Sequence, residues 1–97
     1  MTYFAHMTTV LLTKVQKKLK KLPLHIVRNL QRWAIQIETI GIDEVRKIPG
    51  FHDEPLKGKR TGQRSIRLSK SYRAIYIEYK ENKVDIVSVE EVSKHEY

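Results

Sequence analysis

The spacing of apolar residues changes halfway along this chain of 97 residues, and that change restricts the folds open to it. Up to about residue 41, apolar side chains recur at intervals of three and four, as on one face of a helix. From Gln63 onward they alternate in runs rich in β-branched and aromatic residues, as in strands. Helices first and a sheet second predict an α+β fold, with helices on one sheet face and the other face partly open.

The N-terminal half predicts a helical hairpin after a short strand around residues 9–13. The first helix carries its apolar residues at helical spacing: Leu12, Val15, Leu19 and Leu22. Pro23 ends it, because proline disfavours helical geometry in the residue before it and suits the first turn of a new helix. The second helix runs to Gly41, and its apolar face consists of Ile26, Leu30, Trp33, Ile37 and Ile40. Asp43 is expected to cap one further short turn before Pro49 and Gly50 end the helical half.

The C-terminal half predicts a three-stranded β-meander. Its strands are residues 63–69, 72–79 and 84–92, joined by short polar links. The middle run, YRAIYIEY, is apolar on both parities, as expected of a central strand covered on both sides. The complete prediction is one domain over residues 1–97, in which the N-terminal helical hairpin packs on a small, mainly antiparallel C-terminal sheet. Residues 1–7 have no clear place in this fold and are expected to form a flexible leader; Met7 is either an alternative start or follows residues added to the natural sequence.

Composition excludes several classes of function. The chain has no cysteine, which excludes disulfides, thiolate metal ligands and a thiol nucleophile, and is compatible with a reducing cytoplasm. Its four histidines lack metal-ligand spacing, and its glycines form no phosphate-binding loop, so neither a metal nor a cofactor is expected. No apolar run approaches the roughly 20 residues of a bilayer span. The lysine-rich first helix has the narrow apolar stripe of a core-facing helix, which argues against a membrane-bound one.

The net charge of +8 favours a polyanionic partner, either a nucleic acid, an acidic protein or a membrane surface. The basic residues gather in residues 57–73, KGKRTGQRSIRLSKSYR, which contain no acid. Its glycine-containing loop presents Lys57, Lys59 and Arg60 to such a partner, although the same residues also serve as ordinary solubilising charge. Arg64 and Arg67 differ by three positions and so face opposite sides of a strand; only one can line a cleft, and Arg67 is favoured.

A second group of residues carries acid–base chemistry. Glu54 precedes the basic loop, Arg73 lies in the expected central strand, and the chain ends in Lys94-His95-Glu96-Tyr97. Metal-free cleavage of RNA needs such groups, because the 2′-hydroxyl must lose a proton, the phosphorane must be stabilised and the leaving 5′-oxygen must gain a proton. These residue types are common in small basic proteins, so by themselves they are weak evidence.

The string DEPLKGKRTGQRSIRLSKSYRAIY, followed by a strand and a terminal KHEY, resembles the RelE/ParE toxin superfamily of type II toxin–antitoxin systems, in particular its HigB- and YoeB-like members. The resemblance covers roughly residues 8–97 and includes the order of elements. It implies a metal-independent endoribonuclease of the cytoplasm, without cofactor, that cuts mRNA in the ribosomal A site. The implied partners are mRNA, 16S ribosomal RNA and a cognate antitoxin protein; no membrane and no metal are implied.

The resemblance also implies roles for individual residues. Glu54 matches the general base and Arg73 the arginine that holds the scissile phosphate, whereas His95 and Tyr97 match the terminal pair that acts as general acid or stacks on a base. Which of those two is the acid stays open, and Glu96 between them departs from the family. The implied RNA-binding residues are Lys57, Lys59, Arg60, Arg64, Arg67 and Lys94.

Each assignment has a plainer alternative. Glu54 would otherwise pair with Lys57 or Arg60, Arg73 with Glu78 or Glu90, and the tail would be a polar end of the chain. The aromatic residues expected to serve mainly in packing are Trp33, Tyr72, Tyr76 and Tyr79. Two alternative functions also remain: a ParE-like gyrase poison without catalysis, and a non-toxic nucleic-acid-binding module.

Overall fold

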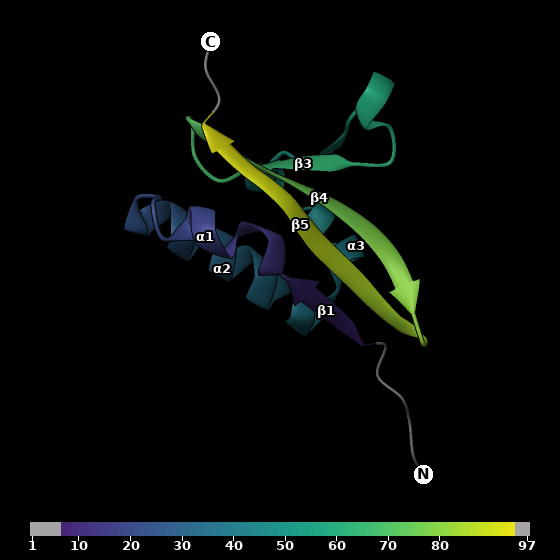
Figure 1. Ribbon diagram of the computed structural model, residues 1–97. Coiled ribbons are helices and arrows are strands. Elements are labelled where there is room, and N and C mark those ends of the chain that lie inside the picture. The colour runs from purple at the N-terminus through teal and green to yellow at the C-terminus, as the bar shows by residue number, and fades with distance from the viewer. Residues whose placement is uncertain (1–6, 95–97) are drawn as a thin grey trace.

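The protein, described by a computed structural model over residues 7–94, has a five-stranded sheet with helices packed against it (Figure 1). The strand order is β1-β5-β4-β3-β2, with β1 parallel to β5 and every other pair antiparallel. The strands are β1 (Thr8–Leu11), β2 (Glu54–Pro55), β3 (Arg64–Arg67), β4 (Tyr72–Glu81) and β5 (Val84–Lys94). The predicted α+β class is confirmed. The sheet is mixed, because β1 adds a parallel edge to the expected meander and β2, which the sequence did not suggest, adds the other edge.

The first arm of the predicted helical hairpin is much shorter than expected. It consists of a 3₁₀ turn, η1 (Thr13–Val15), and a single turn of helix, α1 (Gln16–Leu19). Val15 is its one buried side chain, whereas Leu19 and Leu22 are half-buried. One turn gains little from helix propagation, and the surrounding lysines stay in water, so packing alone sustains this arm.

The second arm forms as predicted. Helix α2 (Leu24–Ile40) buries the expected stripe, and Gly41 ends it with a φ of +87° that favours glycine. Ile40 was expected on the buried face and is 52% exposed. The chain turns at Gly41, and the core is continued instead by Ile42 and Val45 of α3 (Ile42–Arg46). Asp43 does not cap α3; Gly41 is its N-cap residue, and Asp43 lies in the first turn.

The core lies between the helices and one face of the sheet, which we call the helix-covered face. The strand residues that take part lie on this one face, and a register shift between β4 and β5 lets Val92 join Val87 and Val89 on it: Ile66, Ala74, Tyr76, Val87, Val89 and Val92. The largest buried side chain, Trp33 of α2, contacts the Tyr76 ring with centroids 5.2 Å apart and planes tilted by 55°. The amide of Asn29 also donates to the carbonyl of Leu68 at 2.8 Å, which ties α2 to the end of β3.

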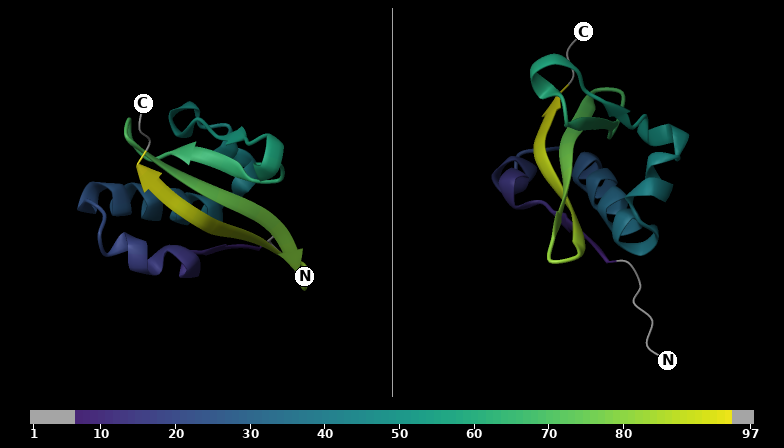
Figure 2. Two further views of the ribbon diagram at one scale, coloured as in Figure 1. Left: turned by 45° about the horizontal axis from the view of Figure 1, so that its top comes forward. Right: turned by 90° about the vertical axis from the view of Figure 1, so that its right-hand side faces the viewer.

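Strands β4 and β5 form a long twisted hairpin that spans the molecule (Figures 1 and 2). A two-residue turn, Asn82-Lys83, joins them with both φ values positive, as in a type I′ turn. Because the turn begins only after Glu81, β4 runs beyond the predicted boundary at Tyr79. At the other end of the hairpin, β5 runs beyond Val92 to Lys94, where it pairs with Tyr72. Among residues 7–94, no helix has the length and apolar character needed to cross a membrane.

Candidate functional site

The strand register gathers three of the predicted site residues on the sheet face opposite the helices, which we call the open face. Glu54 pairs with Ser65, Ser65 with Ile75, and Ile75 with Glu91, so one rung of side chains crosses four strands. The next rung on this face is Arg67, Arg73 and Ser93. From ordinary strand spacings, the backbone of Glu54 lies on the order of 12 Å from that of Arg73, with room for a phosphodiester between the side chains.

Arg73 is available to bind an anion. It is half-buried, and no residue in 7–94 forms an ion pair or side-chain hydrogen bond with it. Its two alternative partners are engaged elsewhere, because Glu78 binds Arg46 and Glu90 binds Lys14 with a nitrogen–oxygen distance of 2.8 Å. Within the part of the chain that the structure describes, Arg73 therefore lacks the structural pairing that would explain an arginine in a central strand.

Glu54 likewise has no ion-pair partner among the described residues. Its side chain is exposed, and no ion pair links it to Lys57 or Arg60 within the described residues. Arg60 reaches instead from the loop to the open face, where its Nη2 lies 3.0 Å from Oε2 of Glu91. Among residues 7–94, the open face thus carries a carboxylate and a guanidinium without ion-pair partners on adjacent rungs.

The basic loop joins β2 to β3 and contains a 3₁₀ turn, η3 (Gly58–Arg60). Lys57 and Lys59 are exposed there and have no ion-pair partner in residues 7–94. Lys94, at the end of β5, is exposed and pairs in register with Tyr72, so it lies on the helix-covered side of the sheet and is not brought together with Glu54 and Arg73. His95 and Tyr97, the predicted acid and stacking residues, lie outside the described residues.

Arg64 and Arg67 lie on opposite faces, as their spacing requires. Arg67 pairs in register with Arg73 on the open face and also lines a pocket of about 240 Å³ beside Asn29 and Arg32 of α2. Arg64 lies at the position opposite Tyr76, on the helix-covered face. Its Nε donates to Oδ1 of Asp53 at 2.6 Å, so this arginine is held by a structural partner.

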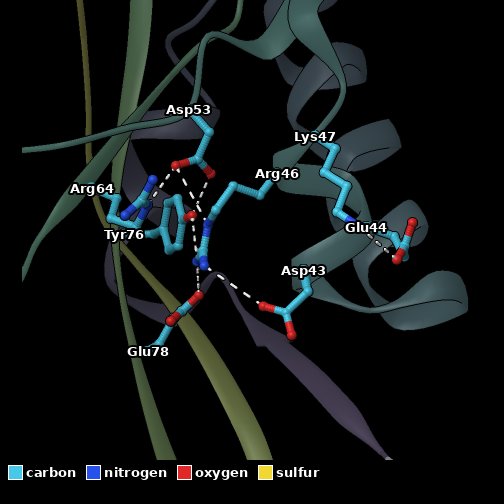
Figure 3. Close-up of polar contacts among 8 residues, drawn as sticks. All are labelled: Asp43, Glu44, Arg46, Lys47, Asp53, Arg64, Tyr76 and Glu78. Atoms are coloured by element: carbon cyan, nitrogen blue, oxygen red, sulfur yellow. Dashed lines mark hydrogen bonds and ion pairs between the residues drawn. The ribbon is translucent and has the colours of Figure 1, made fainter.

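Asp53 is the centre of a polar network that the sequence did not suggest (Figure 3). Its side chain is 1% exposed and accepts hydrogen bonds from Arg64 and from the Tyr76 hydroxyl. Arg46 of α3 joins the network: its Nε lies 3.8 Å from Oδ1 of Asp53, and its Nη2 donates to the Tyr76 hydroxyl at 3.3 Å and to Glu78. Asp53 stands beside another acid, Glu54, just before a basic loop, and nothing in its local pattern indicates burial.

The network raises two pKa values. Burial, together with the hydrogen bond to Asp53, raises the pKa of the Tyr76 hydroxyl well above its usual value, so Tyr76 is a hydrogen-bond donor at neutral pH. Burial by itself lowers the pKa of Arg46, but Tyr76 and Glu78 outweigh it and raise the pKa. The predicted packing role of Tyr76 is confirmed by the contact of its ring with Trp33. Its hydroxyl has a second role, because it donates a hydrogen bond to Asp53.

The other aromatic residues are arranged as follows. Tyr72 is half-buried against the core, in line with a packing role, whereas Tyr79 is 40% exposed. No group of three or more His, Asp or Glu side chains within residues 7–94 is arranged to hold a metal ion.

Comparison with known proteins adds evidence about the fold. No protein-family model matches the sequence, and no curated protein matches it significantly. Solved structures do match. A YoeB/ParE toxin from Agrobacterium tumefaciens is 17% identical, with a TM-score of 0.60, and the alignment covers 93% of this chain and 99% of that one. A chain of the RelBE2 toxin–antitoxin complex from Mycobacterium tuberculosis is 19% identical, with a TM-score of 0.61 and coverages of 93% and 98%.

The chain has the fold of the RelE and YoeB toxins. A chain of the YoeB–YefM complex from Staphylococcus aureus matches over 96% of this chain and 100% of that one, at 18% identity and a TM-score of 0.56. The resemblance to the RelE/ParE superfamily noted in the sequence is therefore confirmed at the level of the fold. The RelE-like fold occupies nearly the whole chain, so its open face is a part of the toxin fold itself.

Proposed function

We propose that this protein is the toxin of a type II toxin–antitoxin system and that it cuts mRNA on the ribosome, in the cytoplasm, without a metal ion. The observation that carries the proposal is the open face of a RelE-like fold, on which Glu54 and Arg73 are both unpaired in the described structure and lie on adjacent rungs. Unpaired charges at such positions contribute nothing evident to folding, and they are the groups that phosphodiester chemistry requires.

The proposed reaction uses these groups in sequence. Glu54 removes the proton of the 2′-hydroxyl, and the resulting oxyanion attacks the neighbouring phosphorus. Arg73 stabilises the charge of the phosphorane, because a guanidinium matches two phosphate oxygens at once. The bond from phosphorus to the 5′-oxygen then breaks, and that oxygen takes a proton from His95 or Tyr97. The products are a 2′,3′-cyclic phosphate and a free 5′-hydroxyl.

The partners follow from charge and from the structural neighbours. Lys57, Lys59, Arg67 and Lys94 bind the phosphates of mRNA and of 16S ribosomal RNA in the A site. The ribosome contributes by holding the substrate in the reactive geometry, which compensates for an incomplete set of acid and base groups. Two of the matched structures are toxin–antitoxin complexes, which supports a cognate antitoxin that neutralises this protein.

The test is primer extension on a reporter mRNA after brief induction of the protein in cells. The variants are Arg73→Ala and His95→Ala, and the matched control is Arg28→Ala, an exposed arginine of α2 outside the open face. We expect new 5′ ends inside translated codons with wild type and the control, and none with the two variants. Retained cleavage in both variants would contradict the proposed mechanism.

Other results would select a different function. Growth arrest with DNA breaks and intact mRNA would identify a gyrase poison on this fold, the activity implied by the ParE branch of the superfamily. Neither arrest nor cleavage, together with salt-sensitive binding of RNA or DNA, would identify a nucleic-acid-binding module.

A further inference from the structure

The strand that carries Glu54 has few backbone contacts of its own. β2 contains two residues at the edge of the sheet, paired with Arg64 and Ser65 of β3. Beyond them, the amide of Leu56 donates to the carbonyl of Gln63 at 2.9 Å. Pro55 has no N–H to donate. So short an edge strand is weakly held by its ladder, and its position depends on neighbouring contacts.

Asp53, the residue immediately before β2, supplies such a contact. Its carboxylate is almost completely buried and is held from three elements: Arg64 of β3, Tyr76 of β4 and Arg46 of α3 (Figure 3). The Tyr76 ring is itself fully buried against Trp33. A charged group in this setting cannot leave its donors without a large loss of free energy, so Asp53 is a fixed point of the chain.

Successive side chains of an extended chain point to opposite faces, and their Cα atoms are about 3.8 Å apart. Asp53 anchored on the helix-covered side therefore places Glu54 on the open face. A shift of β2 by one residue would turn Glu54 inward and pull Asp53 from its donors.

We propose that Asp53 is a positioning residue for Glu54: the buried network fixes the edge strand so that the Glu54 carboxylate stays on the open face across from Arg73. This inference rests on the proposed function, in which Glu54 is the general base. Arg64 has a corresponding part, since it holds Asp53 through its side chain and pairs with Pro55 through its backbone.

The experiment measures cleavage of mRNA by purified protein on programmed ribosomes, with kcat and KM determined separately. The variants are Asp53→Asn, which keeps the shape and removes the charge, and Tyr76→Phe, which removes one donor and keeps the ring. The control is Glu78→Gln, because Glu78 belongs to the same network through Arg46 but does not contact Asp53 in the described structure.

We expect kcat of Asp53→Asn to fall roughly 10- to 100-fold with KM within about two-fold of wild type, because a base displaced by an ångström loses that much rate. Tyr76→Phe should show the same pattern with a smaller loss, and Glu78→Gln should match wild type. Hydrogen exchange provides a second measurement: the Leu56 amide should exchange faster in Asp53→Asn and Tyr76→Phe than in the control.

A folded Asp53→Asn protein with wild-type kcat would overturn the inference, as would equal losses in Asp53→Asn and Glu78→Gln. If Asp53→Asn does not fold, Tyr76→Phe decides by the same criteria. The proposed function fails separately, through a wild-type protein that cuts no mRNA on ribosomes. A Glu54→Gln variant as active as wild type would show that Glu54 is not the general base and would overturn the inference. The proposed cleavage of mRNA would not be affected by that result.

Discussion

Arg64 and Arg73 are arginines of adjacent strands, yet their surroundings differ completely. Arg64 lies on the helix-covered face and donates to a carboxylate that is 1% exposed. Arg73 lies on the open face, half-buried, with no ion-pair partner among residues 7–94. A buried charge must be paired to be tolerated, whereas an unpaired one at a half-open position is free for a ligand. The difference separates arginines that hold the fold from those that can act on a substrate.

The same contrast applies to the carboxylates of neighbouring residues. Asp53 is enclosed by donors from three elements, and Glu54 is exposed without an ion pair in the described structure. One face of the sheet thus contributes stability, and the other presents reactive groups. Four measurements test this division, beginning with the largest effect.

Trp33→Ala should destabilise the protein by about 3–5 kcal/mol, because it leaves a cavity in the core of the helix-covered face. Urea denaturation followed by circular dichroism measures the change. Ile75→Ala on the open face is the comparison, and it should cost less than half as much because Ile75 is half-buried. Equal losses would mean that the open face also contributes to the core.

Arg73→Ala should reduce cleavage about 100- to 1,000-fold, the usual loss when one group that stabilises transition-state charge is removed. Its free energy of unfolding should stay within about 0.5 kcal/mol of wild type, since Arg73 has no partner to lose in the described structure. Kinetics on programmed ribosomes and urea denaturation together measure both quantities. A destabilised variant would place Arg73 among the structural arginines.

Arg64→Ala, unlike Arg73→Ala, should lower the free energy of unfolding. It removes a donor from the buried Asp53 carboxylate, which should lower the free energy of unfolding by about 1–3 kcal/mol. Arg67→Ala, three residues along the same strand, is the control and should unfold like wild type. Stability unchanged in Arg64→Ala would show that Tyr76 and Arg46 satisfy Asp53 by themselves.

The raised pKa of Tyr76 predicts a loss of stability at alkaline pH. Above the ordinary tyrosine pKa of about 10, the unfolded chain releases the phenolic proton while the folded protein keeps it. The unfolded state then binds fewer protons, so the free energy of unfolding falls as pH rises, by at most about 1.4 kcal/mol per pH unit from this group. Tyr76→Phe should remove this fall in the free energy of unfolding between pH 9 and 11, as measured by urea denaturation. An identical slope in both proteins would contradict it.

Much of the fold follows from local pattern. The stripe from Ile26 to Ile37 and the alternation in β4 and β5 each specify their own element, because the period of the apolar residues matches the geometry of the backbone. The predictions were wrong where the length of an element or the segments it packs against decide the structure. The first helix is a single turn, Ile40 is exposed, and β2 is too short to leave a pattern.

The candidate site divides in the same way. Glu54 and Arg73 could be selected from the residue types and the toxin-like string around them, and the opposite facing of Arg64 and Arg67 follows from spacing alone. The sequence could not predict that Arg64 would bind a buried carboxylate or that Arg67 would lie beside Arg73. These contacts join distant segments, since Asp53 is 11 residues from Arg64 in the chain and Tyr76 is 23 from Asp53.

The sequence by itself determined the α+β class, the main helix, the long hairpin and the excess of positive charge, because each depends on periodicity or composition within a continuous segment. Only the tertiary structure decided which charges are paired. Burial and pairing depend on strand register and on contacts between distant segments, and these bring Asp53, Tyr76 and Arg46 together while leaving Arg73 without a partner in the described residues.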